Sequence, residues 1–319
     1  MPSIRRVKEI GDRTGFREDI IEKVIRLENL MLDIFAHPYL SKRFLLKGGT
    51  SLNFCYFNTS RLSVDIDLNY IGKTEIEEMK KEKLEISKSI KKILEDQRYK
   101  LLREPQEEHA GGKWLLGYKD LWDNNRNLEI DINYLFRVSI GVPQEINFKA
   151  FQDSKEFNIT LVSKEELFAG KTVATLFRTS AKDVYDLANI AGYSGEFDRV
   201  LFRKAVILLG SSQRKDFRKI KPDKLQEITE KDIEVFLYPL IPQSERVSRN
   251  KLLRVVEPFV ANLLNFKKEE QEFLDRFLNK AEYIPILLFK EYPNLSKQLE
   301  KHPALLWKRL NVEKHFKAS

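Results

Sequence analysis

The sequence predicts an α/β (α+β) protein in which helices flank a small mixed sheet and a helical lobe follows. Apolar residues recur with a helical period in residues 17–35 and 75–96. They alternate with polar residues in 64–69 and 127–135, as in half-buried strands. From about residue 198 onward the pattern is mainly helical. We therefore expect two domains, residues 1–197 and residues 198–319.

The composition indicates a globular protein with an anionic partner. The chain has 319 residues, of which 42% are hydrophobic and 33% charged, enough for a sizeable core. A formal charge of +8 favours nucleic acid as a partner. No segment approaches the length of a membrane span, and no apolar signal core follows the N-terminus. We therefore expect a cytoplasmic protein with no membrane partner.

The first motif is the glycine pair Gly48-Gly49, which follows the packing helix of residues 17–35 and the apolar run 44–46. Glycines permit a tight turn whose N–H groups point at an anion, since they lack a Cβ. A helix beginning at Thr50 would add its positive dipole end. A glycine pair alone more often marks an ordinary turn, so this motif indicates a phosphate site only in combination with a second one.

A pair of carboxylates comes next, in an apolar strand. In residues 64–69 three apolar side chains alternate with Asp65, Asp67 and Asn69. As a strand, this segment places both aspartates on one face, roughly 7 Å apart at the Cα atoms. Carboxylates this close repel each other unless a cation lies between them, and Mg²⁺ prefers such oxygen ligands. A surface strand can also alternate in this way, but the glycines and the acids together favour a phosphate and metal site.

Antiparallel strands are predicted after the amphipathic helix of residues 75–96. They comprise residues 99–103, 113–118 and 127–135, separated by the turn-rich Gly111-Gly112 and Asp123-Asn124-Asn125. The last of them alternates apolar residues with Glu129, Asp131 and Asn133. If it lies beside the 64–69 strand, Asp131 becomes a third carboxylate, as two-metal phosphoryl-transfer sites require. Taken alone, Asp131 also fits a solvated strand face.

A capping box at Ser163-Lys164-Glu165-Glu166 predicts the start of a further helix. Lys171 and Arg178 fall on one stripe of this helix together with apolar residues. Cations on an otherwise packed stripe point to an anion such as a nucleotide triphosphate. The pattern breaks at residues 179–181.

The next helix begins at Lys182 and places Asp183 and Asp186 one turn apart. These acids could pair with Arg178 and Lys182 and so hold the site together, a role that we favour over direct chemistry.

The strongest concentration of positive charge lies between residues 199 and 224, with nine cations and two acids. Such a segment suits a phosphate backbone and predicts salt-sensitive attraction. A solvated surface loop between helices is the alternative, because Ser211-Ser212 and Pro222 mark a loop. The candidate RNA-binding residues are Arg203, Lys204, Arg214, Lys215, Arg218 and Lys219.

Together these blocks closely resemble the AbiEii/AbiGii toxin family, nucleotidyl transferases of the DNA-polymerase-β-like superfamily. The blocks occur in order as residues 47–52, 61–67, 165–171 with Arg178, and 182–187. The resemblance implies the toxin of a type IV toxin–antitoxin or abortive-infection pair, with a cognate antitoxin as partner. It further implies an enzyme that adds nucleotides to the 3′ end of tRNA.

The resemblance also implies roles for individual residues. Residues 1–197 would form the nucleotidyltransferase domain, and residues 198–319 a helical RNA- or partner-binding domain. Asp65 and Asp67 would be catalytic and bind Mg²⁺, with Asp131 as a third ligand unless a later aspartate serves instead. The triphosphate contacts would be Gly48, Gly49, Thr50, Ser51, Lys171 as a phosphate clamp, and Arg178. Asp183 would be a further acid of the site, and Ser63 a possible phospho-acceptor.

Two other functions are compatible with the residues. A nucleotidyl transferase acting on a small molecule or a protein hydroxyl would share the glycines and aspartates without needing the basic segment. A catalytically idle scaffold that binds RNA or protein would need only the surface charge. No Walker-type loop or Rossmann glycine fingerprint occurs, which disfavours ordinary kinases and dehydrogenases.

Overall fold

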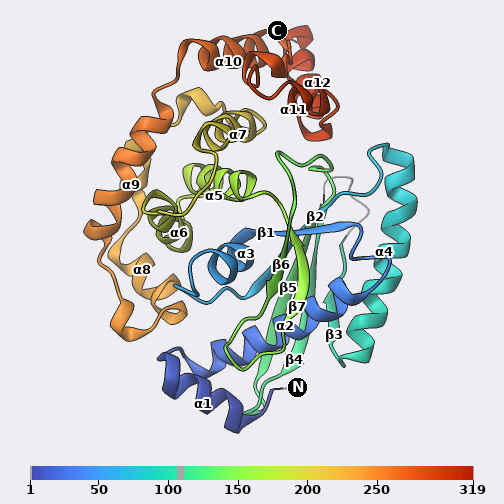
Figure 1. The fold of residues 1–319 in the computed structure, drawn as a ribbon, viewed down its shortest axis with the longest axis vertical. Helices are drawn as coiled ribbons and strands as arrows, with labels where there is room; N and C mark the ends of the chain where they lie inside the picture. Colours follow the sequence, from blue (N-terminus) through green and yellow to red (C-terminus); the bar gives the residue numbers. More distant parts are fainter. Residues whose placement is uncertain (1, 106–110, 319) are drawn as a thin grey trace. The chain divides into compact units, whose positions relative to one another are not determined.

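The computed structural model describes residues 2–105 and 111–318 (Figure 1). The described chain divides into two compact units, neither of them continuous in sequence. The first unit comprises Met1–Arg137, Pro143–Val162 and Glu234–Arg246; the second comprises Val138–Val142, Ser163–Ile233 and Val247–Ser319. This division differs from the predicted boundary at 197/198, because residues 163–197 cluster with the C-terminal helices.

A mixed sheet forms the centre of the first unit, as the alternating patterns predicted. In the described residues it has seven strands in the order β3-β4-β5-β2-β1-β7-β6. The strands are β1 (Phe44–Lys47), β2 (Asp65–Tyr70), β3 (Lys100–Arg103), β4 (Gly111–Lys119), β5 (Asn125–Asn133), β6 (Gln144–Phe148) and β7 (Phe157–Leu161). The pairs β2–β5 and β1–β7 are parallel, and the other neighbours are antiparallel.

The predicted turn at Gly111-Gly112 is wrong, because both glycines belong to β4 and pair with Asn133 and Ile132 of β5. The predicted antiparallel pairing of β3, β4 and β5 is confirmed.

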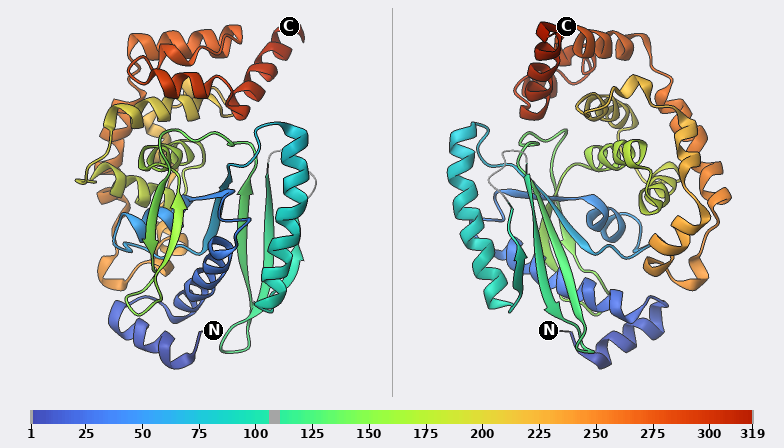
Figure 2. Two further views of the ribbon diagram at one scale, coloured as in Figure 1. Left: turned by 45° about the vertical axis from the view of Figure 1, so that its right-hand side comes forward. Right: turned by 180° about the vertical axis from the view of Figure 1, so that it is seen from behind.

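Helices α2 (Glu18–Ala36) and α4 (Ile76–Asp96) confirm the two periodic segments and pack on the sheet. Figure 2 shows α2 crossing the strands while α4 runs beside β3. The apolar core joins residues of both helices to Ile66 and Leu68 of β2. Since side chains alternate along a strand, Asp65 and Asp67 belong to the opposite face.

Two shorter helices complete this part of the first unit. Helix α1 (Ile4–Thr14) packs on α2, and α3 (Gly48–Cys55) packs on β1, β2 and β6. Helix α3 begins at Gly48 rather than at Thr50, the predicted start. The glycine pair therefore forms the first turn of the helix and not a separate loop.

The second unit is helical, as predicted for the C-terminal part. Its helices are α5 (Lys164–Arg178), α6 (Ala181–Ala191), α7 (Arg199–Ser211), α9 (Arg249–Leu264), α10 (Lys268–Lys280), α11 (Pro293–Leu299) and α12 (Pro303–Ala318). Helix α5 packs against α6 and α7, and α6 packs against α9. The chain passes back to the first unit within α8 (Glu230–Phe236).

Ser163 caps α5 as predicted, since its Oγ accepts a hydrogen bond from the Glu166 N–H at 3.1 Å. The Glu166 carboxylate accepts from the Ile140 N–H at 2.6 Å, which ties α5 to the segment Val138–Val142. The predicted loop at 199–224 is wrong in its first half. Helix α7 occupies that half because its apolar residues, including Leu201 and Phe202, are buried.

Within residues 2–105 and 111–318, no helix combines the length and apolarity needed to span a membrane.

Candidate active site

The predicted carboxylates lie side by side on one face of the central strands. Strand β2 pairs with β5 in parallel register, with Asp67 opposite Asp131 and Asp65 opposite Glu129. Register partners on neighbouring strands project from the same face. Asp131 was predicted to join the two aspartates only if the two strands are neighbours, and the structure shows that they are. Its role as a metal ligand stays a prediction.

A lysine flanks the two central acids on each side. Strand β1 places Lys47 opposite Asp67, and β4 places Lys113 opposite Asp131. We call Lys47, Asp67, Asp131 and Lys113 the charged row, since they follow one register line across β1, β2, β5 and β4. The two aspartates therefore have a lysine as register partner on either side.

Lys113 makes the closest charge contacts in this region. Its Nζ lies 3.1 Å from Glu129 Oε2 and 3.9 Å from Asp131 Oδ2. Burial alone would lower the pKa of Lys113, but the carboxylates of Glu129, Asp131 and Asp65 raise it above its ordinary value. The ammonium group is therefore charged at neutral pH and remains half exposed.

Gly48 and Gly49 permit close packing around the second aspartate and Ser63. Gly48 has a φ of +75°, and a Cβ at this position would lie 1.9 Å from Asp67 Oδ2. A Cβ on Gly49 would lie 2.8 Å from both Ser63 Oγ and Arg61 Nη2. Only glycine fits at position 48, because both the backbone angle and the carboxylate exclude a side chain.

The hydroxyl groups of Thr50 and Ser51 hold α3 in place. Thr50 Oγ1 donates to the Asp65 carbonyl at 2.6 Å, and Ser51 Oγ donates to the Gly48 carbonyl at 3.0 Å. Both side chains are fully buried. The N-cap of α3 is Lys47, whose side chain has no acceptor atom. The N-cap side chain therefore accepts no hydrogen bond from the N–H groups of the first turn. An anion site at the start of a helix requires this.

Ser63 is buried in this structure, with 6% of its surface exposed. Its neighbour Arg61 is 3% exposed and donates from Nη1 to the Leu62 carbonyl at 2.9 Å. Phosphorylation of Ser63 would therefore require this segment to open first, and the predicted role stays untested.

The donor set fits a cation shared with a phosphate rather than one enclosed by protein. Among the described residues, no group of three or more His, Cys, Asp or Glu side chains is arranged to hold a metal ion. Mg²⁺, however, commonly uses one or two carboxylates and takes further ligands from phosphate and water. Asp67 and Asp131 are register partners on one sheet face, with Asp65 on the same face. This donor set of two or three carboxylates is compatible with such a shared ion.

The predicted site residues of the second unit form a buried ion-pair network between α5 and α6. Lys171 Nζ lies 2.9 Å from Asp183 Oδ1 and 2.9 Å from Asp186 Oδ2. The guanidinium of Arg178 also binds Asp183, through Nε and through Nη2 at 2.8 Å. Lys171, predicted as a phosphate clamp, is thus held by two carboxylates, whereas Arg178 keeps 64% of its side chain exposed.

The electrostatics of Asp183 follow from these contacts. Burial alone would raise the pKa of Asp183, but Lys171 and Arg178 hold it far below its ordinary value. Ser180, the N-cap of α6, adds a hydrogen bond from its Oγ to Asp183 Oδ2 at 2.6 Å. Asp183 is therefore ionised at neutral pH.

The predicted RNA-binding residues divide into two groups. Arg203 forms a bidentate pair with Glu270, at 2.6 and 2.8 Å, and Arg218 lies 2.6 Å from Asp275. Lys204 is 8% exposed and donates to the Leu288 carbonyl. These three cations stabilise the helical unit. The exposed members of the set are Arg214, Lys215 and Lys219.

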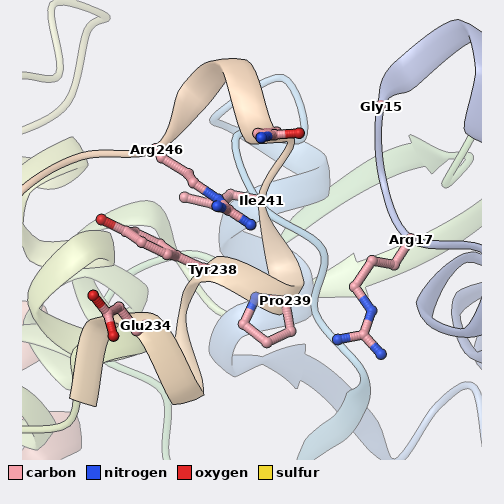
Figure 3. A pocket seen from close by; sticks show the side chains of 8 residues that line it. Gly15, Arg17, Glu234, Tyr238, Pro239, Ile241 and Arg246 are labelled. Atoms are coloured by element: carbon pink, nitrogen blue, oxygen red, sulfur yellow. The ribbon is translucent and has the colours of Figure 1, made fainter. Parts of the chain in front are cut away.

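A pocket of about 530 Å³ lies elsewhere on the first unit (Figure 3). Its lining residues are Gly15, Arg17, Glu234, Tyr238, Pro239, Ile241, Gln243 and Arg246. The guanidinium carbon of Arg246 lies 4.7 Å from the centroid of the Tyr238 ring. None of these lining residues belongs to the predicted site.

Lys47 and Lys113 are neighbours of the aspartates that the sequence patterns did not predict, whereas Glu129 was expected on the face of Asp131. Lys113 could have been found from the turn at Asp123-Asn124-Asn125, because a hairpin turn determines which residues of β4 and β5 lie opposite each other. The turn itself was predicted, but the register that it sets was not.

Comparison with known proteins agrees with this fold. The family model for the nucleotidyl transferase AbiEii toxin of type IV toxin–antitoxin systems matches residues 29–278. Among solved structures, MenT4, a nucleotidyltransferase toxin from Mycobacterium tuberculosis H37Rv, superposes with a TM-score of 0.65 at 16% identity. The match covers 94% of this chain and 99% of that one, and at this identity it shows the fold alone. None of the curated proteins matches the sequence of this chain.

Proposed function

Because the chain belongs to the AbiEii family of nucleotidyl transferase toxins, we propose that it transfers a nucleotide from a nucleoside triphosphate to the 3′ end of an RNA. A tRNA is the proposed acceptor and Mg²⁺ the proposed metal. We further propose that a cognate antitoxin protein silences the enzyme and that it acts in the cytoplasm, where tRNA is found.

The single observation that carries this proposal is the register of β2 and β5. It brings Asp65, Asp67 and Asp131 onto one sheet face, next to the glycine turn that begins α3. A triphosphate requires both features: carboxylates that hold a divalent ion, and N–H groups that bind phosphate oxygens. No Cβ separates Gly48 from Asp67, so the start of α3 and the carboxylate lie close together, where the N–H groups would bind a phosphate and the carboxylate its metal ion.

In the proposed reaction the 3′-oxygen of the RNA bonds to the α-phosphorus while the bond from that phosphorus to the oxygen bridging it to the β-phosphorus breaks. The hydroxyl proton passes to solvent water, and pyrophosphate leaves. Asp65 and Asp67, with Asp131, would hold Mg²⁺, which when bound neutralises triphosphate charge and acidifies the attacking hydroxyl. The N–H groups of the α3 first turn bind phosphate oxygens and stabilise the charge that develops on pyrophosphate. Thr50 and Ser51 fix that turn through their buried hydroxyl groups.

Lys171, Arg178 and Asp183 are proposed to take part through their network. Arg178 is the residue with exposed surface for a phosphate. Lys171 and Asp183 are buried, so we propose that they orient Arg178, and that direct contact between Lys171 and a phosphate would require release from Asp183 and Asp186.

The test is incorporation of each of the four labelled nucleoside triphosphates, with Mg²⁺, into total tRNA. We expect the wild type to label RNA 3′ ends, and Asp65→Asn to lose at least about a hundredfold in rate because the metal loses a charged ligand. Glu145→Gln removes an exposed carboxylate from β6 of the same sheet and is the matched control.

The outcomes separate the possible acceptors. A folded Asp65→Asn variant with undiminished incorporation would contradict the proposal. Label on the protein itself would indicate a protein hydroxyl as acceptor. If the wild type labels neither RNA nor protein, a small-molecule acceptor or an inactive scaffold becomes the better interpretation.

A further inference from the structure

We propose that Lys113, which pairs with Glu129, is a positioning residue whose ammonium group competes with the metal ion for the carboxylate of Asp131. Metal loading would then require Lys113 to leave these acids. The inference rests on the proposed function, because it concerns the same metal, but it adds a residue to which no role in the reaction had been given.

The positions of Lys113 and the two aspartates explain why the ammonium group and a metal ion would compete. Lys113 lies on β4 directly opposite Asp131, and Asp131 lies directly opposite Asp67. The ammonium group is 3.1 Å from Glu129 and 3.9 Å from Asp131, so it lies within ion-pair distance of both carboxylates. A divalent ion shared by Asp67 and Asp131 would lie close to this ammonium, and like charges at such separations repel.

Lys113 can leave because it is held weakly. Half of its side chain is exposed, as are 35% of Glu129 and 38% of Asp131. Ion pairs at this exposure contribute little, because water solvates both partners nearly as well. The lysine can therefore neutralise the acids while no metal is bound and turn to solvent when an ion arrives.

Lys47 does not play the same part. It is opposite Asp67 in the register, but it belongs to the N-cap of α3 and precedes the glycine turn. Lys113, by contrast, lies within strand β4 and does not adjoin the start of a helix. Of the two lysines, we therefore assign Lys113, next to Asp131, as the cation that the metal ion displaces.

The experiment measures Mn²⁺ binding to nucleotide-free protein, using the electron paramagnetic resonance signal of free Mn²⁺. Manganese replaces magnesium because both prefer carboxylate ligands. The variants are Lys113→Met, which removes the charge but keeps the length, and Lys113→Arg, which keeps the charge. Lys119→Met is the matched control, as Lys119 lies on the same strand with 56% of its side chain exposed and pairs with Asp123.

We expect Lys113→Met to bind Mn²⁺ about tenfold more tightly than the wild type, because a nearby positive charge is removed. Lys113→Arg and Lys119→Met should stay within about twofold of the wild type, since the local charge at Asp131 is unchanged. Adding Asp67→Asn to Lys113→Met should abolish the gain, which places the ion at the charged row.

An unchanged or weakened Mn²⁺ affinity in Lys113→Met would overturn the inference, as would a gain that survives Asp67→Asn or appears equally in Lys119→Met. The absence of Mn²⁺ binding in both wild type and Lys113→Met would also overturn it. These failures are distinct from failure of the proposed function, which is decided by whether Asp65→Asn abolishes nucleotide incorporation. Thermal melting of each variant establishes that it is folded.

Discussion

At Gly48 the backbone and the Asp67 carboxylate leave no room for a side chain. The φ of +75° is one that an L-residue adopts at a cost, and an added Cβ would lie 1.9 Å from Asp67 Oδ2. The carboxylate must therefore move if any side chain is introduced. Since Asp67 is a proposed metal ligand, a substitution at Gly48 should affect activity more than folding.

We predict that Gly48→Ala lowers nucleotide incorporation more than tenfold while destabilising the fold by only roughly 1–2 kcal/mol. The control is Gly170→Ala in α5, where a new Cβ meets no atom within 4 Å. This substitution should stabilise the helix by roughly 0.5–1 kcal/mol and leave incorporation intact. Rates and urea unfolding curves measure both effects. Equal losses of activity in the two variants would count against a special role for Gly48.

At the scale of elements, the junction of α5 and α6 depends on one buried carboxylate. Asp183 accepts hydrogen bonds from Lys171, Arg178 and Ser180. The backbone turns between the helices at Thr179, which has a φ of +48°. Because Asp183 is 1% exposed, its charge is stable only while these donors surround it.

The pH dependence of stability follows from the depressed pKa of Asp183. A carboxylate whose pKa is lower in the folded state than in the unfolded state stabilises the fold at pH values above its unfolded-state pKa, which is 3.8 for Asp183. This stabilisation is lost as the pH falls below that pKa. We predict that Asp183→Asn costs about 3 kcal/mol at pH 7, because Arg178 loses its carboxylate partner and Lys171 keeps only Asp186. Urea unfolding between pH 7 and pH 3 should show a smaller loss of stability for this variant than for the wild type. If the two pH profiles are parallel, Asp183 is not the titrating group.

Elements with a clear period could be predicted from sequence, whereas their pairing could not. Helices α2, α4 and α5 each carry a continuous apolar stripe, and their predicted ranges hold within a few residues. Strands β6 and β7 are five residues each, too short for a distinct alternation. The charged row depends on the β4–β5 turn, in which Asp120 accepts from the Trp122 and Asn124 N–H groups. Such a register is a property of turn geometry and cannot be read from alternation alone.

Pairing between distant residues also could not be predicted for the basic segment, residues 199–224. Arg203 looks like a surface charge in the sequence because its partner, Glu270, lies more than fifty residues away, and Asp275 is an equally distant partner of Arg218, which also pairs with the nearby Asp216. Only the folded helices bring the distant charges together. The acids of the central strands, by contrast, could be predicted because alternation alone places Asp65 and Asp67 on one face.

At the scale of the whole molecule, the charge of +8 must be divided into cations that hold the fold and cations available to a partner. Intramolecular pairs use Arg203, Lys204 and Arg218. The exposed cations of the same segment are Arg199, Arg214, Lys215, Lys219 and Lys221, three of which (Arg214, Lys215 and Lys219) belong to the predicted RNA-binding set. An RNA backbone would therefore be attracted by the second group, and net charge alone overstates the binding surface.

We predict that replacing Arg214, Lys215 and Lys219 together with Gln weakens tRNA binding about tenfold and lowers the slope of log K against log salt by about 2. The control replaces Lys80, Lys88 and Lys92 of α4 with Gln, which changes the net charge equally. Those lysines already pair with Glu77, Glu85 and Asp96. They should therefore release few counterions to RNA, and fluorescence anisotropy at several salt concentrations should show near wild-type binding. Equal weakening by both triple variants would instead mean that binding follows overall charge, without a defined surface.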